Sequence, residues 1–152
     1  MKKYKYAMFW IFLTISLGGC GLKNRVKSID TEKESLVFND SNFVDLYMRV
    51  YSDPQRYEGC TIEVEGIFYI SEYNDNVYYM VIRNGVGMCE YHEYELIGFE
   101  FEYDAVDAIE DGQWIKVSGT LGVYYEGENG IMVIRDAQVE ALEEEGSVFV
   151  YK

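Results

Sequence analysis

The feature that most constrains the fold is a series of strand-like segments that follows residue 60. Residues 61–70 (TIEVEGIFYI) alternate apolar and charged side chains, as a strand with one buried face does. Comparable segments, rich in β-branched and aromatic residues, follow at 77–83, 98–103, 114–125 and 131–142. Turn-forming residues lie between several of them, as at 73–76 and 126–130. The sequence therefore predicts a mainly β fold with five strands.

The connections between these segments are expected to differ in length. The turn at 73–76 joins the first two strands into a hairpin, whereas residues 84–97 are expected to form a long irregular loop. Residues 147–152 add a short edge strand. The acidic run at 143–145 is interpreted as a solvated exit from the last long strand rather than a metal site.

Two of the strand segments share the pattern I-x-V-x-G, at residues 62–66 and 115–119. A glycine inside a strand usually marks a bulge or a sharp bend, and strands must bend at the corners of a small closed barrel. Gly66 and Gly119 are therefore predicted to lie where the barrel wall turns. Five strands, with bends in the first and fourth and a long connection after the second, indicate a five-stranded OB-like Greek-key barrel.

The strand alternation also predicts which side chains form the core, because residues two apart on a strand share one face. The predicted core members are Ile62, Val64, Phe68, Val81, Ile82, Phe99, Phe101, Trp114, Val117, Leu121, Val133 and Val139.

One amphipathic helix is expected before the strands, over residues 41–51. Its apolar side chains recur at spacings of three and four residues, which places them on one helical face. They are Phe43, Leu46, Tyr47, Val50 and Tyr51. Asp40 or Ser41 is expected to cap the N-terminus of this helix, and Pro54 is expected to end it.

The N-terminus has the organisation of an export signal. Lys2, Lys3 and Lys5 precede an apolar run over residues 7–17. As a helix this run would be about 16 Å long, half of a ~30 Å hydrocarbon core, so it reads as a signal peptide and not as a membrane span. Residues 17–20 (LGGC) resemble the lipobox of bacterial lipoproteins. The resemblance implies a diacylglyceryl group on Cys20, which anchors the chain at the extracytoplasmic face of the cell membrane.

Three segments are therefore expected. They are a lipoprotein signal peptide at 1–19, a lipidated Cys with a flexible polar tether at 20–40, and an OB-like barrel domain at 41–152. The chain has 13 basic and 27 acidic residues, a net charge of −14, and loss of the three lysines near its start makes the net charge −17. Such a chain repels phosphates, so nucleic acid is not an expected partner.

Several motifs of the predicted domain resemble a known family. They are 54–59 (PQRYEG), 62–66 (IEVEG), 78–85 (YYMVIRNG), 98–101 (GFEF) and 114–119 (WIKVSG). As a set they are similar to an uncharacterised OB-fold-like lipoprotein family of Gram-positive bacteria. That family is related to the C-terminal domain of a permease-associated membrane-protein family. The resemblance implies an OB-like barrel and, as partner, a membrane permease or another envelope protein.

The family that the sequence resembles carries Cys-Cys-x-x-Asp just after its second strand. Here Met88 replaces the first Cys, Cys89 matches the second, and His92 stands at the Asp position. Cys89 and His92 have a spacing that lets both reach one Zn²⁺, and Cys60 and nearby carboxylates are candidate further ligands. Those carboxylates are Glu90, Glu93 and Glu95.

Two other interpretations of the cysteines are open. Cys60 and Cys89 can form a disulfide, because the chain is expected to be exported. Alternatively both thiols are reduced and Cys60 packs in the core. Catalysis by Cys89 with His92 as base is the least favoured interpretation, because it also requires an orienting group and an oxyanion hole.

Tyrosines gather around the strand ends and loops of the predicted barrel, at Tyr69, Tyr73, Tyr78, Tyr79, Tyr91, Tyr94, Tyr124 and Tyr125. OB barrels bind ligands across their second and third strands, often by stacking on aromatic rings. Tyr78, Tyr79, Tyr91 and Tyr94 are therefore candidate ligand-contacting residues, although tyrosine also suits half-buried strands for structural reasons. With this net charge, a sugar chain, a cation or another protein is better matched as ligand than a nucleic acid.

The sequence alone thus predicts a membrane-anchored extracytoplasmic lipoprotein that acts as a non-catalytic binding or interaction module and needs no cofactor. The alternative is a zinc-binding lipoprotein that assists a permease.

Overall fold

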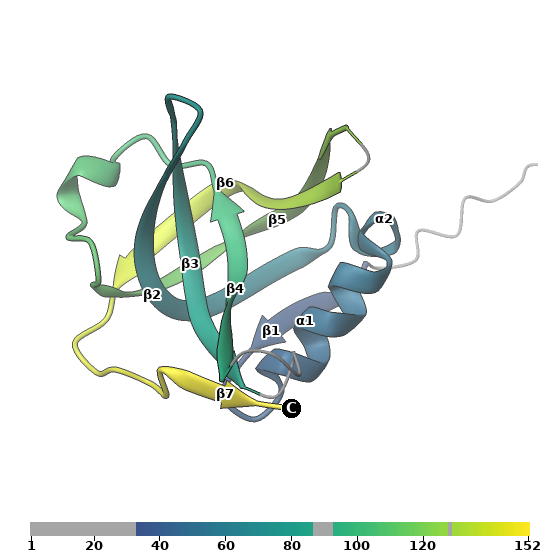
Figure 1. Ribbon diagram of the computed structural model, residues 1–152, viewed down its shortest axis with the longest axis horizontal. Coiled ribbons are helices and arrows are strands. Elements are labelled where there is room, and N and C mark those ends of the chain that lie inside the picture. Colours follow the sequence, from purple (N-terminus) through teal and green to yellow (C-terminus); the bar gives the residue numbers. More distant parts are fainter. Residues whose placement is uncertain (1–32, 87–92, 128) are drawn as a thin grey trace, which may run out of the picture.

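The computed structural model describes residues 33–86, 93–127 and 129–152, which form a mainly β fold (Figure 1). The strands are β1 (Ser35–Phe38), β2 (Thr61–Tyr73), β3 (Asn76–Val86), β4 (Tyr94–Phe101), β5 (Trp114–Glu126), β6 (Asn129–Ala141) and β7 (Phe149–Tyr151). The helices are α1 (Phe43–Ser52), α2 (Pro54–Tyr57) and the 3₁₀ turn η1 (Val106–Ala108). Within these ranges, no helix is long and apolar enough to cross a membrane.

The five long strands close into a barrel in the order β2-β3-β4-β6-β5-β2. Neighbouring strands run antiparallel except β4 and β6, which are parallel. This order, in which the third and fifth barrel strands pair in parallel, is that of an OB-like Greek-key barrel. The predicted fold class is therefore confirmed.

β2 changes partners next to Gly66, as the glycine pattern predicted. The strand pairs with β5 up to Ile67 and with β3 from Ile67 onward. A Cβ at Gly66 would lie 2.6 Å from the backbone oxygen of Ile82, which is closer than van der Waals contact allows. β2 and β3 therefore lie so close together at this corner that the position of Gly66 needs a residue without a side chain.

Gly119 marks the second irregularity of the barrel wall. The register of β5 against β6 shifts between Ser118 and Thr120, and Asp136 on the facing strand has a φ of +52°. A Cβ at Gly119 would lie 2.5 Å from the backbone oxygen of Arg135. A bulge of this kind bends its strand and increases the local twist, so Gly119 serves the barrel geometry, as predicted.

The prediction of a long irregular loop at 84–97 is wrong at both ends of that range, where the chain forms strands. β3 continues to Val86 and β4 begins at Tyr94, so that Asn84 lies opposite Leu96 and Val86 lies opposite Tyr94. Asn and Gly lower the strand propensity of this segment, but the ladder between the two strands outweighs that local preference. Residues 87–92 lie outside the described residues.

The folded domain was expected to begin at residue 41, but it begins earlier, with β1. β1 pairs in parallel with β2, so that Leu36 lies opposite Ile62 and Phe38 opposite Val64. Leu36 and Phe38 are both buried. Part of the expected tether is thus a strand, which four residues of alternation were too short to reveal. At the other end, β7 pairs in parallel with β3 and confirms the expected edge strand.

α1 is the predicted amphipathic helix, and its inner face buries Phe43, Leu46 and Val50. Its expected caps are wrong. Asn42 is the N-cap residue and makes no side-chain cap hydrogen bond, while the carboxylate of Asp40 binds an arginine of the barrel instead. Pro54 follows the helix as expected, but it also begins the short α2, because proline suits the first position of a helix.

The predicted core residues are all buried except Val139, which is partly buried against the core. The strand phases are therefore correct. The core also contains side chains from outside the five long strands: Leu36, Phe38, Phe43, Val44, Leu46, Val50, Tyr57, Cys60 and Val150.

Arg83 of β3 is the buried charged side chain among the described residues, with 1% of its surface exposed. Its Nε donates to the backbone oxygen of Glu65 at 2.7 Å. Its Nη1 donates to the Asp40 carboxylate at 2.8 Å and to the backbone oxygen of Ser147. The guanidinium also lies 4.4 Å from the ring centroid of Trp114. Arg83 thereby ties the segment before α1 and the segment before β7 to the barrel.

Candidate functional site

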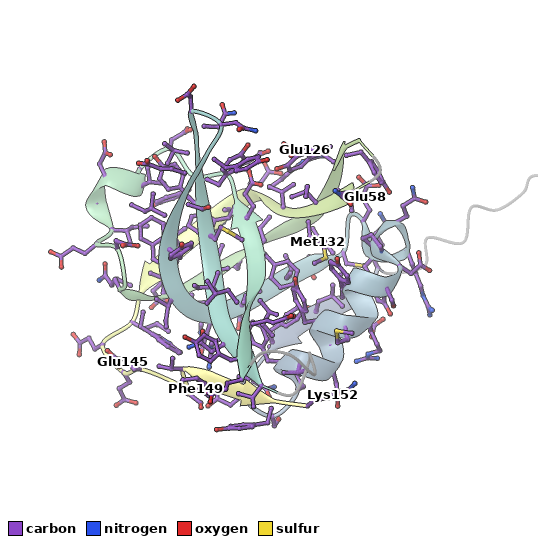
Figure 2. All side chains as sticks on the ribbon, viewed as in Figure 1. Glu58, Glu126, Met132, Glu145, Phe149 and Lys152 are labelled. Carbon is purple, nitrogen blue, oxygen red and sulfur yellow. The ribbon has the colours of Figure 1, made fainter. Side chains whose placement is uncertain are left out.

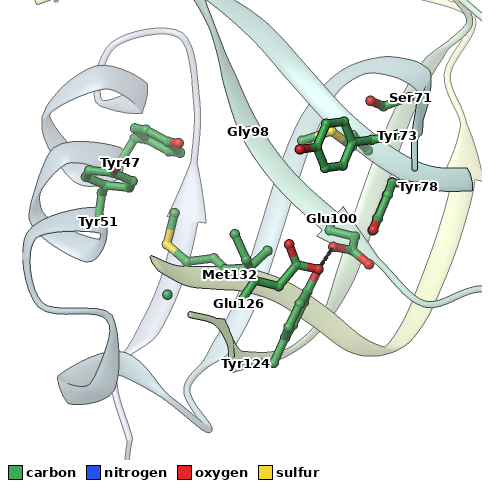
Figure 3. A pocket seen from close by; sticks show the side chains of 13 residues that line it. Tyr47, Tyr51, Ser71, Tyr73, Tyr78, Gly98, Glu100, Tyr124, Glu126 and Met132 are labelled. Carbon is green, nitrogen blue, oxygen red and sulfur yellow. Dashed lines mark hydrogen bonds between the residues drawn. The ribbon is translucent and has the colours of Figure 1, made fainter. Parts of the chain in front are cut away.

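A pocket of about 280 Å³ opens between α1, the β2–β3 hairpin, β4 and the β5–β6 hairpin (Figure 3). Both hairpins point toward the top of the view in Figure 1. β3 and β4 are the second and third strands of the barrel, the face with which OB barrels bind ligands. The lining residues are Tyr47, Tyr51, Ser71, Tyr73, Tyr78, Met80, Gly98, Glu100, Tyr124, Glu126, Gly130, Ile131 and Met132.

α1 supplies two of the tyrosines. Tyr47 and Tyr51 are four residues apart, so they lie one above the other on the same face of the helix. Their rings are stacked, with centroids 5.9 Å apart and an interplanar angle of 17°. Tyr47 also meets Phe99 of the core edge-on at 5.7 Å. The pair is therefore held in place before any ligand arrives.

The β2–β3 hairpin supplies Tyr73 and Tyr78, one on each side of its turn. The turn residues Asn74 and Asp75 have φ values of +49° and +63°, which is the backbone that two-residue hairpin turns require. Tyr78 lines the pocket, whereas its neighbour Tyr79 stacks on Phe68 with ring centroids 6.0 Å apart. Successive strand residues point to opposite faces, so only Tyr78 of this pair is available to the pocket.

A phenol and a carboxylate meet across the pocket. Tyr124 Oη donates to Glu100 Oε2 at 2.6 Å (Figure 3). Burial raises the pKa of Glu100; the hydrogen bond from Tyr124 opposes this, and the negative charges of Glu102 and Glu126 add to it. Burial also raises the pKa of Tyr124, together with its bond to the Glu100 carboxylate. Tyr124 therefore remains a neutral donor at physiological pH.

Burial is also the main reason that the pKa of Tyr47 is raised to about 12, with the neighbouring Tyr51 adding to the effect. The phenols of Tyr47 and Tyr124 are thus uncharged near neutral pH. The charge of the pocket comes from Glu100 and Glu126, and no basic side chain lines it in the part of the chain that the structure describes. The site is an aromatic pocket with a negative potential.

Two further hollows adjoin the pocket. One shares Tyr51, Gly130 and Ile131 with it and extends toward Pro54 and Tyr125. There, Gln55 Nε2 donates to Tyr125 Oη at 2.9 Å, which links α2 to the β5–β6 hairpin. The other hollow shares Tyr73 and follows the β2–β3 turn. The pocket therefore has a further hollow beside it at the tip of each hairpin.

Of the ligand-contacting residues proposed from the sequence, the structure places one in the pocket and others elsewhere. Tyr78 lines the pocket, and Tyr79 packs toward the core. Tyr94 packs edge-on against Phe149 of β7 at 5.7 Å. Figure 2 shows Phe149 at the end of the molecule away from Glu126, so Tyr94 is not part of this site. Tyr91 lies outside the described residues.

The cysteine and histidine candidates are placed only in part. Cys60 is buried in the core, which confirms the prediction that its side chain packs there. Cys89 and His92 lie outside the described residues, as does Glu90. Within the ranges that the structure covers, no group of three or more His, Cys, Asp or Glu side chains is arranged to hold a metal. The zinc and disulfide hypotheses remain predictions.

Sequence reasoning missed the role of Glu100 and of the two helical tyrosines. The helical spacing predicts that Tyr47 and Tyr51 belong to the apolar face of the helix, yet Tyr51 is 59% exposed. The sequence signal that could have identified this pair is the four-residue spacing of the two tyrosines, which places both at the edge of the apolar face. For Glu100 the only signal is its alternation with Phe99 and Phe101, which places it on the outer surface of the barrel.

Comparison with known proteins gives a family match. The model of the DUF1980 C-terminal domain family matches residues 21–152. No curated protein matches the chain with significant sequence similarity. The family match spans the barrel, both terminal strands and α1, so the chain belongs to the DUF1980 C-terminal domain family.

Proposed function

We propose that the chain is a membrane-anchored extracytoplasmic lipoprotein whose barrel is a non-catalytic binding module. The observation that carries the binding role is the tyrosine-lined pocket on the ligand-binding face of the barrel. Its walls come from four parts of the chain. Tyr47 packs edge-on against Phe99 and stacks on Tyr51. Preformed aromatic walls of this kind favour binding because little side-chain freedom is lost.

The chemistry of the lining residues supports binding rather than catalysis. Among the described residues, no His, Cys or Lys side chain lines the pocket, and His is the side chain that most often serves as a general base. The phenol of Tyr124 is engaged as a hydrogen-bond donor to Glu100. These groups are suited to holding a ligand in place.

The membrane part of the proposal is supported by the N-terminal sequence. The basic start, the apolar run and Cys20 have the order of a lipoprotein signal. Two acyl chains on Cys20 would give stable anchoring. A membrane permease or another envelope protein held in the same membrane is the proposed partner, and Gram-positive bacteria are the proposed source of this lipoprotein type.

Metabolic labelling with a fatty-acid analogue tests the anchor. Labelled lipid is expected on the wild-type chain and not on Cys20→Ala, and Cys89→Ser is the control because it removes a thiol outside the lipobox. A wild-type chain that stays unlabelled and is recovered from the medium would show that the anchor is wrong.

Titration of the full chain with three probe classes tests the binding role. The probes are choline as an organic cation, a neutral N-acetylglucosamine oligomer and inorganic phosphate. Tyr51 and Tyr73 are 59% and 63% exposed, so the double change Tyr51→Ala, Tyr73→Ala should leave the fold intact. Saturable binding of at least one probe is expected, and it should weaken by about tenfold in the double variant.

Tyr151 of β7 provides the matched control, because it is 69% exposed and lies outside the pocket. Tyr151→Ala should bind like the wild type. Failure of all three probes, or equal binding by the double variant and the wild type, would contradict the binding role of this pocket.

A further inference from the structure

We infer that the pocket takes an organic cation, an amine or quaternary ammonium group, held between the tyrosine rings and the carboxylates of Glu100 and Glu126. This inference rests on the proposed binding function and names the ligand class of that same site. It follows from the meeting of aromatic rings and uncompensated negative charge in one cavity.

The rings provide the first half of the recognition. A cation is attracted to the face of an aromatic ring when it lies within about 6 Å of the ring centroid. Five tyrosines line the pocket, and they come from α1, the β2–β3 hairpin and β5. The pocket that these rings line is small, about 280 Å³, so a ligand in it is within reach of lining rings. Rings on several sides are the usual way in which quaternary ammonium groups are recognised.

The carboxylates provide the second half. Glu100 Oε2 accepts the hydrogen bond from Tyr124, and Oε1 of the same group accepts none from the described residues. Glu126 is exposed at the β5–β6 hairpin, and its charge acts on both Glu100 and Tyr124. The two carboxylates repel each other, so a positive ligand between them gains attraction and also removes that repulsion.

The same charges argue against the other small-ligand classes. An anion would meet Glu100 and Glu126, and the described lining residues include no basic side chain to offset their charge. A neutral sugar can stack on tyrosine rings, but it leaves the repulsion between the carboxylates in place. The net charge of −14 also attracts cations to the whole molecule, which raises the rate at which a cation reaches the pocket.

A pair of isosteric probes separates charge from shape. Choline and 3,3-dimethyl-1-butanol have the same outline, but only choline carries a positive charge. Calorimetric titration of the full chain is expected to show choline binding about tenfold or more tighter than the neutral alcohol.

Glutamine variants test whether the two carboxylates cause the difference in affinity between choline and the neutral alcohol. Glu100→Gln keeps an oxygen that can accept from Tyr124, and Glu126→Gln changes an exposed side chain. Each is expected to weaken choline binding by about fivefold to tenfold. The matched control is Glu140→Gln, which removes the same charge from an exposed position of β6 outside the pocket and should change affinity by less than about twofold.

The outcomes distinguish this inference from the proposed function. Equal binding of choline and its neutral isostere, or binding of only the neutral sugar oligomer, would show that the ligand class is wrong while the binding role stands. Choline binding that Glu100→Gln and Glu126→Gln leave unchanged would also overturn the inference. Absence of binding by every probe would overturn both proposals.

Discussion

Arg83 is fully buried and Glu100 is half-buried, and the surroundings of the two charges differ. Arg83 is surrounded by acceptors from three segments and by the ring of Trp114. The groups that act on Glu100 are one phenol and two further carboxylates, none of them positive. The first arrangement stabilises the fold, whereas the second leaves a negative charge available to a ligand.

The structural role of Arg83 predicts a large loss of stability when it is replaced. Arg83→Met leaves the backbone oxygens of Glu65 and Ser147 without their donor, so the free energy of unfolding should fall by about 3 kcal/mol. Arg135→Met is the control, because that side chain is exposed and its nearest Glu102 oxygen is 4.0 Å away. The control should change stability by less than about 1 kcal/mol. Urea unfolding measures both, and equal losses would contradict the role of Arg83.

The raised pKa of Glu100 predicts how stability depends on pH. The folded state holds the Glu100 proton to a higher pH than the unfolded state, so stability falls as pH rises from the ordinary glutamate pKa of 4.5 through the folded value. Glu100→Gln removes this dependence. The stability of the variant relative to wild type should therefore increase as pH rises through that window and then level off.

Urea unfolding at a series of pH values, from about 4 to about 7, measures this difference. The exposed Glu140→Gln is the control for removal of a negative charge. A difference between Glu100→Gln and wild type that shrinks as pH rises would show that burial does not hold the proton on Glu100.

Among the elements, those with a long alternating pattern could be predicted from the sequence and the short ones could not. β2 and β5 carry many alternations and a glycine at the corner, so both the strands and their bends were predictable. β1 has four residues and owes its place to pairing with β2. The ends of β3 and β4 contain residues of low strand propensity, and the ladder between them decides their structure.

The close strand crossings predict that a single methyl group at either corner is destabilising. Gly66→Ala and Gly119→Ala would each place a Cβ within 2.6 Å of a backbone oxygen, so each should lower the free energy of unfolding by about 2 kcal/mol or more. Gly127→Ala is the control, because no atom lies within 4 Å and only its φ of +65° is unfavourable. That change should have an effect of about 1 kcal/mol. Thermal melting compares the three variants, and an unchanged melting temperature for both corner variants would contradict the crossing geometry.

The assignment of β1 to the folded domain predicts a contrast between two adjacent residues. Leu36 is 1% exposed and Val37 is 46% exposed. Leu36→Ala should therefore lower the free energy of unfolding by about 2–5 kcal/mol, whereas Val37→Ala should change it by less than about 1 kcal/mol. Similar small effects in urea unfolding would mean that this segment belongs to the tether and not to the barrel.

For the whole molecule, the barrel and Tyr78 of the site could be predicted from local patterns, but the rest of the site could not. Tyr47 and Tyr51 come from the helix before the barrel, and Glu100 and Tyr124 come from strands on either side of η1. These residues meet only because the barrel closes and α1 packs against β4. The tyrosine content indicated that an aromatic site was possible, and closure of the barrel decided which tyrosines form it.

Chemical-shift mapping by NMR tests the central claim most directly, namely that this pocket of the barrel binds an organic cation. Choline is added to the isotope-labelled full chain, and backbone amide shifts are followed to saturation. The predicted result is a set of shifts concentrated at Tyr47, Tyr78, Gly98, Glu100 and Met132, which line the pocket from four elements. Shifts concentrated instead around Tyr94 and Phe149 at the far end of the molecule, or no saturable shifts at all, would contradict it.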